Sequence, residues 1–392
     1  MSNWMIPYNK IKDSGDQKQL DFIDNVTKSD DNTWIQGFAG SGKSIVLVHS
    51  IVNILNEDSS ATVCVVVFTN SLIEMFTAGM QELKIPHENV HLTTYHNFIK
   101  TNANYDYIFC DEVQDLPKSV LENMRSRASK QLIVAGDSNQ SIYDEDPDTK
   151  EKVIEISEIG NVTNSTSYKL DTIHRLTKSI IGLISKLLPS MNIFSAQQNR
   201  TKKDISVRLA KGKNKEEECK YILSEAEMAI AGDQNVVILL PYHKTISEFI
   251  NIILGIKGIK PWDAEKNLNR WGKTDYSQLH QYLKQNNVNF EYIGNGYGNL
   301  YEATNKNKII IMTYHSAKGL DFDNVFLPFL SKDTFNNYFT KTLFMVGMTR
   351  SKNNLYLTYS NSLHNYVESF KQNCQEFDID NDAGSSSPDF DF

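Results

Sequence analysis

The sequence has 392 residues and a formal net charge of −8, from 40 Lys and Arg against 48 Asp and Glu. This length suffices for roughly two to three domains, and a hydrophobic content of 40% with 22% charged residues excludes collagen-like, fibrous and wholly disordered chains. The negative charge argues against a nucleic-acid partner, which usually meets a basic surface. Six carboxylates fall within residues 376–392, however, where there is no Lys or Arg, so residues 1–375 carry −8 + 6 = −2. A local basic groove is therefore compatible with the composition.

The sequence shows no sign of a secretory or membrane protein. Residues 1–12 mix aromatic residues, proline and charges, so we expect no signal peptide. The longest apolar runs, such as Val63–Phe68, are far shorter than the roughly 20 residues of a membrane span. The cysteines form no CxxC pair, and Cys64 and Cys110 lie in strand-like runs, which favours buried thiols over disulfides or zinc ligands. We expect a cytoplasmic protein with no membrane partner.

Short apolar runs alternate with helix-length segments along the chain, which is the pattern of parallel sheets covered by helices. The first series of predicted strands is Thr33–Gln36, Thr62–Thr69, Tyr107–Asp111 and Gln131–Ala135. The second series is Asn235–Leu240, Lys308–Thr313, Asn324–Phe329 and Asn354–Tyr359. The polar stretch Asn161–Ser167 separates the two series. We therefore predict an α/β fold with domains over residues 1–165 and 166–375, followed by a disordered acidic tail over residues 376–392.

A phosphate-binding loop follows the first predicted strand. The run from Gly37 to Ser44 satisfies GxxxxGK(S/T) and opens an apolar helix at Ile45–Leu55, which is the context that the P-loop motif requires. Its glycines let backbone N–H groups close around phosphate oxygens, and the helix N-terminus adds a favourable field. Lys43 would reach the β- and γ-phosphates of ATP, and the Ser44 hydroxyl would ligate Mg²⁺. The predicted nucleotide-binding positions of this loop are Gly37, Ala39, Gly40, Ser41, Gly42, Lys43 and Ser44.

The third predicted strand ends in two carboxylates, Asp111 and Glu112. An aspartate at the end of such a strand would hold Mg²⁺ together with Ser44. Glu112 is then positioned to orient or deprotonate the attacking water. We predict Asp111 and Glu112 as catalytic residues of an ATPase with ATP and Mg²⁺ as cofactors.

Five further segments, in order along the chain, resemble motifs of the UvrD/Rep family of superfamily 1 helicases. They are Asp111–Asp115 for DExQD, Ala135–Tyr143 for GDxxQSIY, His174-Arg175 for the Tyr-Arg of motif IV, Thr313–Phe322 for TxHSxKGLEF and Val346–Ser351 for VAxTRA. Together with the P-loop and the glutamine expected before it, the matches lie in the right order within about residues 17 to 359, most of the chain. The resemblance implies two tandem RecA-like P-loop NTPase domains, and an ATP-dependent helicase or translocase that moves 3′→5′ on single-stranded DNA or at a junction of single- and double-stranded DNA.

The resemblance also implies roles for single residues at the nucleotide. Gln140 would contact the γ-phosphate and report its loss. Arg175 and Arg350 would come from the second domain and meet the γ-phosphate, a position that suits permanently charged, planar guanidinium groups. ATP would thus draw the two domains together, and hydrolysis would release them.

Other nucleotide contacts implied by the resemblance lie further from the phosphates. Gln19, with apolar residues three and four positions later, is favoured as the reader of the adenine edge, with Gln17 as the alternative. His174 replaces the tyrosine that stacks on adenine. Gly319 and Asp321 belong to the motif at Thr313–Phe322.

Nucleic-acid contacts are expected from segments that resemble motif Ia and the TFHSF motif. Aromatic and small polar groups at these positions can stack bases and hold phosphates without reading sequence, although core packing is the competing interpretation for Tyr95. His315 is expected to couple the nucleotide and DNA sites. The predicted nucleic-acid-binding residues are Phe68, Asn70, Thr94, Tyr95, His96, Tyr143 and His315.

The chain also departs from the family. Only residues 97–110 separate His96 from Asp111, which leaves no room for the usual 1B subdomain, and residues 294–308 are too few for the 2B subdomain. The run Asp144–Asp146 replaces Gly-Trp-Arg and would repel phosphate. The segment Lys257–Lys273 carries five cations, two carboxylates and two tryptophans. It is either a small basic insertion (residues 257–275) that binds a single strand or a solvated loop anchored by tryptophan.

We therefore expect a monomeric, pared-down motor. The first alternative is a nucleotide-gated switch or motor subunit that acts with a partner protein, such as a nuclease, and does not unwind DNA alone. The second alternative, a small-molecule kinase, would explain Lys43 and Asp111 but not Gln140 or Arg350. The acidic end of the chain resembles the partner-recruiting tail of bacterial single-strand-binding proteins, and it is either a site for a protein partner or a solubilising tail.

Overall fold

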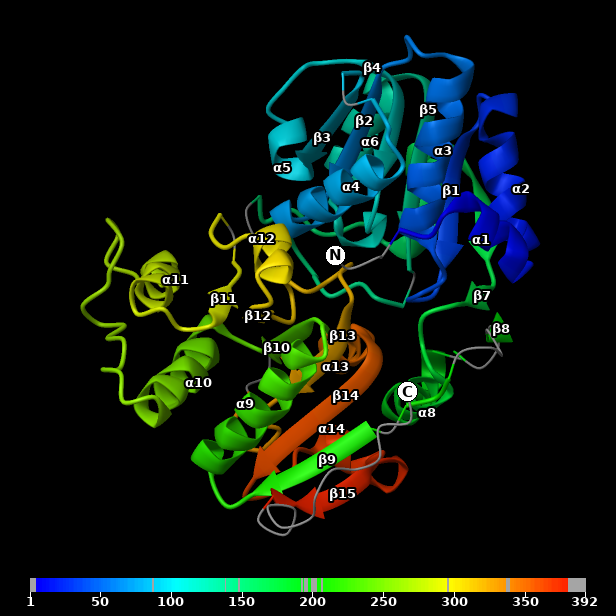
Figure 1. The fold of residues 1–392 in the computed structure, drawn as a ribbon. Helices are drawn as coiled ribbons and strands as arrows, with labels where there is room; N and C mark the ends of the chain where they lie inside the picture. Colours follow the sequence, from blue (N-terminus) through cyan, green and yellow to red (C-terminus); the bar gives the residue numbers. More distant parts are fainter. Residues whose placement is uncertain are drawn as a thin grey trace. The chain divides into compact units, whose positions relative to one another are not determined.

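The structure is a computed structural model that describes residues 5–379, except for residues 87, 138, 147–148, 192, 194–196, 199–202, 206, 295 and 336–338 (Figure 1). The chain divides into two compact units. Unit 1 comprises Met1–Leu176 and Met191–Lys202, and unit 2 comprises Thr177–Ser190 and Lys203–Phe392. Each unit is a parallel sheet with helices packed on it, as the sequence predicts.

Unit 1 contains a six-stranded sheet in the order β3-β2-β4-β5-β1-β6, with every neighbouring pair parallel. All five residues of β2 are buried, as expected for a strand that helices cover on both faces. A short parallel pair, β7 and β8, stands apart from this sheet. The strands are β1 Asn32–Gly37, β2 Val63–Val67, β3 Val90–Thr94, β4 Tyr105–Cys110, β5 Ala128–Gly136, β6 Ser165–Leu170, β7 Thr172–Ile173 and β8 Gln197–Gln198. The helices are α1 Tyr8–Ser14, α2 Gln17–Asn25, α3 Lys43–Glu57, α4 Asn70–Glu82, α5 Tyr95–Phe98, α6 Lys118–Arg127 and α7 Ile159–Thr163.

The first unit extends beyond the boundary expected at residues 165 and 166. The polar stretch Asn161–Ser167 is not a linker, because it holds the end of α7 and the start of β6, and β6 pairs in register with β1. An edge strand is partly solvated, so its polar residues conceal it in the sequence. The division lies between Leu176 and Thr177 instead.

Unit 2 contains a seven-stranded sheet in the order β11-β12-β10-β13-β14-β9-β15, again with every pair parallel. Its core includes Phe249, Ile250, Leu279 and Phe326, from α10, α11 and β13. The strands are β9 Val207–Gly212, β10 Val236–Leu240, β11 Phe290–Tyr292, β12 Ile309–Thr313, β13 Phe322–Leu327, β14 Ser351–Ser360 and β15 Gln375–Asp378. The helices are α8 Lys178–Leu187, α9 Lys215–Ala231, α10 His243–Ile256, α11 Tyr276–Gln285, α12 Leu300–Asn305, α13 Lys341–Met348 and α14 Asn365–Glu368.

The start of the predicted acidic tail belongs to the second sheet. Strand β15 pairs with β9. Oε1 of Glu376 accepts a hydrogen bond of 2.7 Å from the Tyr359 hydroxyl and forms an ion pair of 2.9 Å with Lys371. The expectation of a flexible segment from residue 376 is therefore wrong for residues 376–379. The rest of the predicted tail, residues 380–392, lies outside the described residues.

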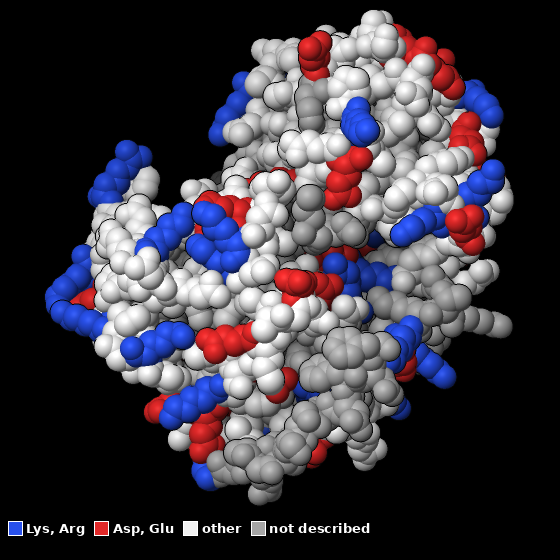
Figure 2. All heavy atoms as spheres, viewed as in Figure 1, with Lys and Arg blue, Asp and Glu red and all other residues white. Residues whose placement is uncertain are grey.

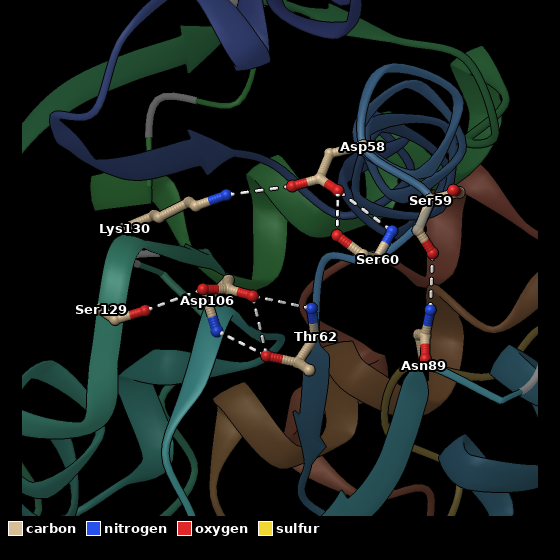
Figure 3. A network of polar contacts seen from close by, with 8 residues as sticks. All are labelled: Asp58, Ser59, Ser60, Thr62, Asn89, Asp106, Ser129 and Lys130. Atoms are coloured by element: carbon tan, nitrogen blue, oxygen red, sulfur yellow. Dashed lines mark hydrogen bonds and ion pairs between the residues drawn. The ribbon is translucent and has the colours of Figure 1, made fainter.

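Polar side chains tie together the amino ends of the strands in unit 1 (Figure 3). The Asp106 carboxylate accepts hydrogen bonds from the backbone N–H of Thr62, at 2.9 Å, and from the hydroxyl of Ser129, at 3.0 Å. Nearby, Lys130 donates to Asp58 over 3.2 Å. These contacts fix the loops at the amino edge of the sheet. In a parallel α/β unit, ligands bind at the opposite edge, where the carboxyl ends of the strands lie.

The connections in which relatives carry extra subdomains are short. Residues 99–104 alone join α5 to β4, and residues 293–308, which include α12, join β11 to β12. No helix among the described residues is both long and apolar enough to cross a membrane.

Candidate functional site

The P-loop joins β1 to α3 at the carboxyl edge of the first sheet. Gly40 and Gly42 have positive φ angles of 75° and 84°, a conformation that glycine adopts without steric cost. The Lys43 ammonium donates to the carbonyl oxygens of Gly37, at 2.9 Å, and Phe38, at 3.3 Å. It therefore lies inside the loop, where a bound phosphate would also lie.

Two features of the loop fit a bound anion. The hydroxyl of Ser41 is buried and has no hydrogen-bond partner among the described residues. A Cβ atom at Gly37 would come within 2.3 Å of that hydroxyl, so only glycine keeps this space open. A buried donor without a partner costs free energy unless a ligand satisfies it. The loop therefore fits the nucleotide phosphates that its sequence predicts.

The predicted magnesium ligands lie side by side. The Ser44 hydroxyl donates to Oδ2 of Asp111 over 2.6 Å. Burial, and then the charge of Glu112, raise the pKa of Asp111 to about 6, against the opposing effects of Ser44 and Lys43. A carboxylate held in this way, next to a second carboxylate, is stabilised by a bound cation. Ser44 and Asp111 are thus placed to hold Mg²⁺ with a nucleotide.

Glu112 is held in an uncommon backbone conformation. Its φ of 58° lies in the left-handed region, which a residue with a side chain adopts at some cost, and strain of this kind concentrates at functional sites. Its backbone N–H donates to Oδ1 of Asp111 over 2.9 Å. The backbone of Glu112 thus helps to hold the Asp111 carboxylate in place.

Gln114 connects the two acidic motifs, a role that the sequence did not predict. Its Nε2 donates to Oε2 of Glu112 over 2.6 Å, and its Oε1 accepts from the backbone N–H of Asp137 over 3.1 Å. A Cβ atom at Gly136 would lie 2.3 Å from that oxygen, which explains the glycine of the GDxxQ motif. The backbone N–H of Gln140 donates to the Asp137 carbonyl over 3.1 Å, so Gln140 follows directly from this link. The sequence feature that could have indicated this role is Gln114 itself, because it is the glutamine of the DExQD motif.

The two candidate adenine readers lie in different places. Nε2 of Gln19 donates to the Ser41 carbonyl over 2.8 Å, whereas the exposed Gln17 donates to Asp21. A Cβ atom at Gly42 would lie 2.4 Å from Nε2 of Gln19. Gln19, and not Gln17, thus contacts the P-loop.

His174 and Arg175 also meet the P-loop, and both fall within unit 1. Their backbone N–H groups donate to the Gly40 carbonyl over 2.9 and 3.2 Å. Nε2 of His174 lies 2.6 Å from Oδ2 of Asp16, the N-cap residue of α2. The sequence-based expectation that Arg175 belongs to the second domain is therefore wrong, because the chain crosses to unit 2 only after it has returned to the P-loop.

In unit 2, Arg350 is nearly fully buried, with 2% of its surface exposed. Its Nη1 donates to the Leu320 carbonyl, its Nε to the Val346 carbonyl, both at 2.9 Å, and its Nη2 to the Thr349 hydroxyl at 2.8 Å. The arginine thus joins the two helicase-like motifs of this unit.

The other predicted residues of unit 2 lie in the first of those motifs. Gly319 has a positive φ of 79°, and the Asp321 carboxylate lies 3.8 Å from Lys352. Burial, followed by Lys318 and His243, lowers the pKa of His315 to about 4, so its imidazole is neutral at pH 7.

The predicted nucleic-acid residues of unit 1 come together as a row of rings, which we call the aromatic row: Tyr143, Phe68, Tyr95 and His96. Phe68 is stacked between Tyr143, at 5.2 Å, and Tyr95, at 5.1 Å, measured between ring centroids. His96 follows at 4.8 Å from Tyr95. Phe68 and Tyr143 are half-buried and Tyr95 is buried. Three motifs that are far apart in sequence thus form one packed row, in which Tyr95 belongs to the hydrophobic core and Phe68 packs against that core.

The remaining predicted residues flank this row. Asn70 is the first residue of α4, and the Thr94 hydroxyl caps α5 by accepting from the Asn97 N–H. The acidic run is not wholly a repulsive surface, because Asp146 is fully buried and accepts from the Tyr95 hydroxyl at 2.6 Å and from the Thr149 N–H at 2.7 Å. Of the run Asp144–Asp146, only the first two acids are exposed.

Comparisons with known proteins agree with these motifs. A model of the UvrD-like helicase C-terminal domain matches residues 293–362. A model of the viral superfamily 1 RNA helicase core domain matches residues 33–226. No curated protein sequence matches the chain significantly.

Two solved structures of the helicase nonstructural protein 10 of an arterivirus are similar to this chain. The protein without DNA is 14% identical over 90% of this chain and 64% of its own, with a TM-score of 0.45. The complex with DNA is 14% identical over 91% and 65%, with a TM-score of 0.43. The chain thus spans less than two thirds of the length of these helicases. By its two family models and its ordered motifs, the chain belongs to the superfamily 1 helicases.

Proposed function

We propose that this chain hydrolyses ATP to move along single-stranded DNA in the 3′→5′ direction, as a compact UvrD/Rep-like motor. The observation that carries the proposal is the hydrogen-bonded link from Ser44 through Asp111 to Glu112 and Gln114 at the carboxyl edge of the first sheet, which supports a metal site and a base there. The aromatic row at the same edge ends in two half-buried rings, Tyr143 and His96, which are the candidates for stacking on unpaired bases.

In this proposal the residues of unit 1 act together on ATP. Bound Mg²⁺ would neutralise the phosphate charge that grows in the transition state. Ser44 and Asp111 would hold that ion, and Lys43 would exchange its carbonyl partners for phosphate oxygens. Glu112, oriented by Gln114, would accept the proton of the attacking water. Gln140 would sense the γ-phosphate, and Arg175 and Arg350 would stabilise its charge.

The test measures phosphate release with single-stranded DNA, single-stranded RNA, duplex DNA and no nucleic acid. We expect single-stranded DNA to stimulate turnover most, and Lys43→Ala to abolish turnover in every case. Displacement of streptavidin from only one end of a biotinylated strand reports direction. Unchanged ATPase activity in Lys43→Ala would reject the assignment, and turnover indifferent to any nucleic acid would reject the motor.

The short connections favour a second candidate, a nucleotide-gated subunit that acts with a partner such as a nuclease. Residues 99–104 and 293–308 leave the chain without large insertions that could separate a duplex. A strand-displacement assay on the chain alone distinguishes the two functions, because a switch subunit would hydrolyse ATP without releasing a strand.

The partner-binding role of the acidic end belongs to the same proposal. Because β15 is part of the second sheet, the informative truncation begins at residue 380 rather than at residue 376. If residues 380–392 recruit a partner, their removal lowers partner binding and leaves ATPase activity unchanged. Equal binding by the truncated chain would assign them to solubility.

A further inference from the structure

The connection between α10 and α11 runs over residues 257–275, longer than most loops in compact domains. It lies in unit 2, and it contains none of the residues assigned above to the ATP site or to the aromatic row. In Figure 2, Lys and Arg side chains gather over the region that joins these two helices. Long loops in compact domains are usually functional, so this long and basic connection is a candidate binding segment.

The first part of the connection is anchored to the core. Trp262 is buried, with 4% of its surface exposed. The Asn251 side chain on α10 holds both polar groups of the Trp262 backbone, at 2.8 Å to its N–H and 2.9 Å to its carbonyl. The Tyr282 hydroxyl on α11 donates to the Lys260 carbonyl over 2.7 Å. Both flanking helices thus fix the start of the connection.

The second part forms a tight turn, which we call the Trp271 hairpin (residues 267–275). The backbone N–H of Asn269 donates to the Lys273 carbonyl over 2.7 Å, and the Asp275 N–H donates to the Asn267 carbonyl over 2.8 Å. Oδ1 of Asn269 accepts from the N–H groups of Trp271, at 2.9 Å, and Lys273, at 3.1 Å. Such a side-chain-capped turn is pre-ordered, so a ligand at its tip need not supply the ordering entropy.

The tip of the hairpin presents an aromatic ring between cations. Trp271 is 69% exposed, more than any other large hydrophobic side chain in the described part of the chain. The Arg270 guanidinium lies 4.0 Å from the centre of its ring, which leaves the opposite face to solvent. Within the described residues, neither Arg270 nor Lys273 makes an ion pair, whereas Lys266 is paired with Asp263 at 3.0 Å. Two unpaired cations thus flank one exposed ring.

We propose that the Trp271 hairpin is a second contact for single-stranded nucleic acid. The exposed face of Trp271 stacks on one unpaired base, and Arg270 and Lys273 meet the neighbouring phosphates. A single strand is favoured over a duplex because stacking on a side chain needs a base face that pairing and neighbouring bases do not cover. It is favoured over a protein because the cations carry no acidic partners here and the only other exposed apolar side chain of the turn is Leu268. The inference rests on the proposed function for the class of ligand.

The first experiment measures the affinity of the full chain for a fluorescent 20-residue oligo-dT and for oligo-rU by anisotropy, without nucleotide. Trp271→Ala is expected to weaken binding about 5- to 30-fold, the lower part of the range for loss of one base stack. Trp271→Phe keeps a stacking face and is expected to stay within about 3-fold of wild type. The matched control is Met228→Ala, which removes an exposed side chain of α9. Wild-type affinity in Trp271→Ala would overturn the proposal.

The second experiment tests the cations through salt dependence. Arg270→Ala/Lys273→Ala is expected to lower the slope of log affinity against log salt by about 1.4, because each phosphate contact on a single strand contributes about 0.7. The control, Lys220→Ala/Lys306→Ala, removes the same charge from exposed ion pairs on α9 and after α12. An equal fall in slope for both double variants would reject a specific site and indicate a general charge effect.

The two proposals fail in different ways. If no nucleic acid stimulates the ATPase of the wild-type chain or binds it, the proposed function falls. If single-stranded nucleic acid binds the wild-type chain and stimulates its ATPase, and Trp271→Ala has the same affinity, only the hairpin proposal is rejected. ATPase activity without nucleic acid is expected to be unchanged in every hairpin variant, since none of these residues lies in the nucleotide site. Loss of duplex binding alone would reject the single-strand assignment.

Discussion

The side-chain amide of Gln114 donates a hydrogen bond of 2.6 Å to Oε2 of Glu112. The other end of the same amide accepts from the Asp137 backbone over 3.1 Å. Gln114 therefore sets the direction of the candidate base relative to the segment that leads to Gln140. Because the amide reaches both motifs at once, it can link the position of the base to the state of the γ-phosphate sensor.

Replacement of Gln114 should reduce catalysis without removing nucleotide binding. In Gln114→Ala the Glu112 carboxylate loses its orienting donor, and we expect kcat to fall about 10- to 100-fold with KM for ATP within about 3-fold of wild type. Glu112→Gln should lower kcat by about 100-fold or more, because the base itself is lost. Steady-state ATPase assays separate the two effects. Gln36→Ala, which removes an amide that donates to the Ser167 hydroxyl on the edge strand β6 over 2.8 Å, is the control. A rise in KM alone would assign Gln114 to nucleotide binding instead.

Substitution of Gly42 should impair nucleotide binding beyond its cost to folding. Alanine at a positive φ of 84° costs about 1 kcal/mol of stability. Its Cβ would also meet Nε2 of Gln19 at 2.4 Å and displace that side chain. Gly15→Ala is a matched control, because Gly15 has a φ of 71° and open space around it. Thermal unfolding should show similar losses for both variants, and titration with a fluorescent ATP analogue should show weaker binding for Gly42→Ala alone. Equal affinities would show that Gln19 does not contribute to the site.

Local sequence was sufficient for the parts of the site that one segment builds. The glycine-lysine motif identifies the P-loop, and Asp111 follows the apolar run Ile108–Cys110, so their place at the carboxyl edge of a parallel sheet could be predicted from the chain alone. The spacing of apolar residues favours Gln19 over Gln17, but both lie on α2, and only the fold shows which of them reaches the Ser41 carbonyl.

The corrected expectations share a physical cause. The edge strands β6 and β15 are polar because one side of each is solvated, so their sequences alone predict a linker and a tail. The acidic run around Asp146 predicts a repulsive surface, because the burial of Asp146 depends on Tyr95, which is far away in the sequence. In each case the tertiary partner, and not the local pattern, decides the environment.

Unit 2 should lose stability in mild acid through His315. Burial, Lys318 and His243 lower the pKa of this imidazole to about 4, whereas the unfolded chain protonates near 6.5. Between these values the unfolded state binds more protons, so stability falls as the pH drops from about 6.5 to about 4 and the loss is complete below that. His315→Asn should remove up to about 3 kcal/mol of this loss. Denaturant unfolding at several pH values measures it, with His91→Asn, an exposed site on β3, as the control. An unchanged pH profile in His315→Asn would contradict the assignment.

The aromatic row predicts that Tyr95 and Phe68 have separable roles. Tyr95→Phe keeps the ring but removes the hydroxyl that donates to the buried Asp146, so it should cost about 1–3 kcal/mol of stability and leave single-strand affinity within about 2-fold of wild type. Phe68→Ala removes the ring on which Tyr143 stacks, so it should displace Tyr143 and weaken single-strand binding about 5-fold or more. Denaturant unfolding and anisotropy with labelled oligo-dT measure the two effects on the same variants. If Phe68→Ala lost stability and kept its affinity, the row would be part of the core of unit 1, and the single strand would contact other residues.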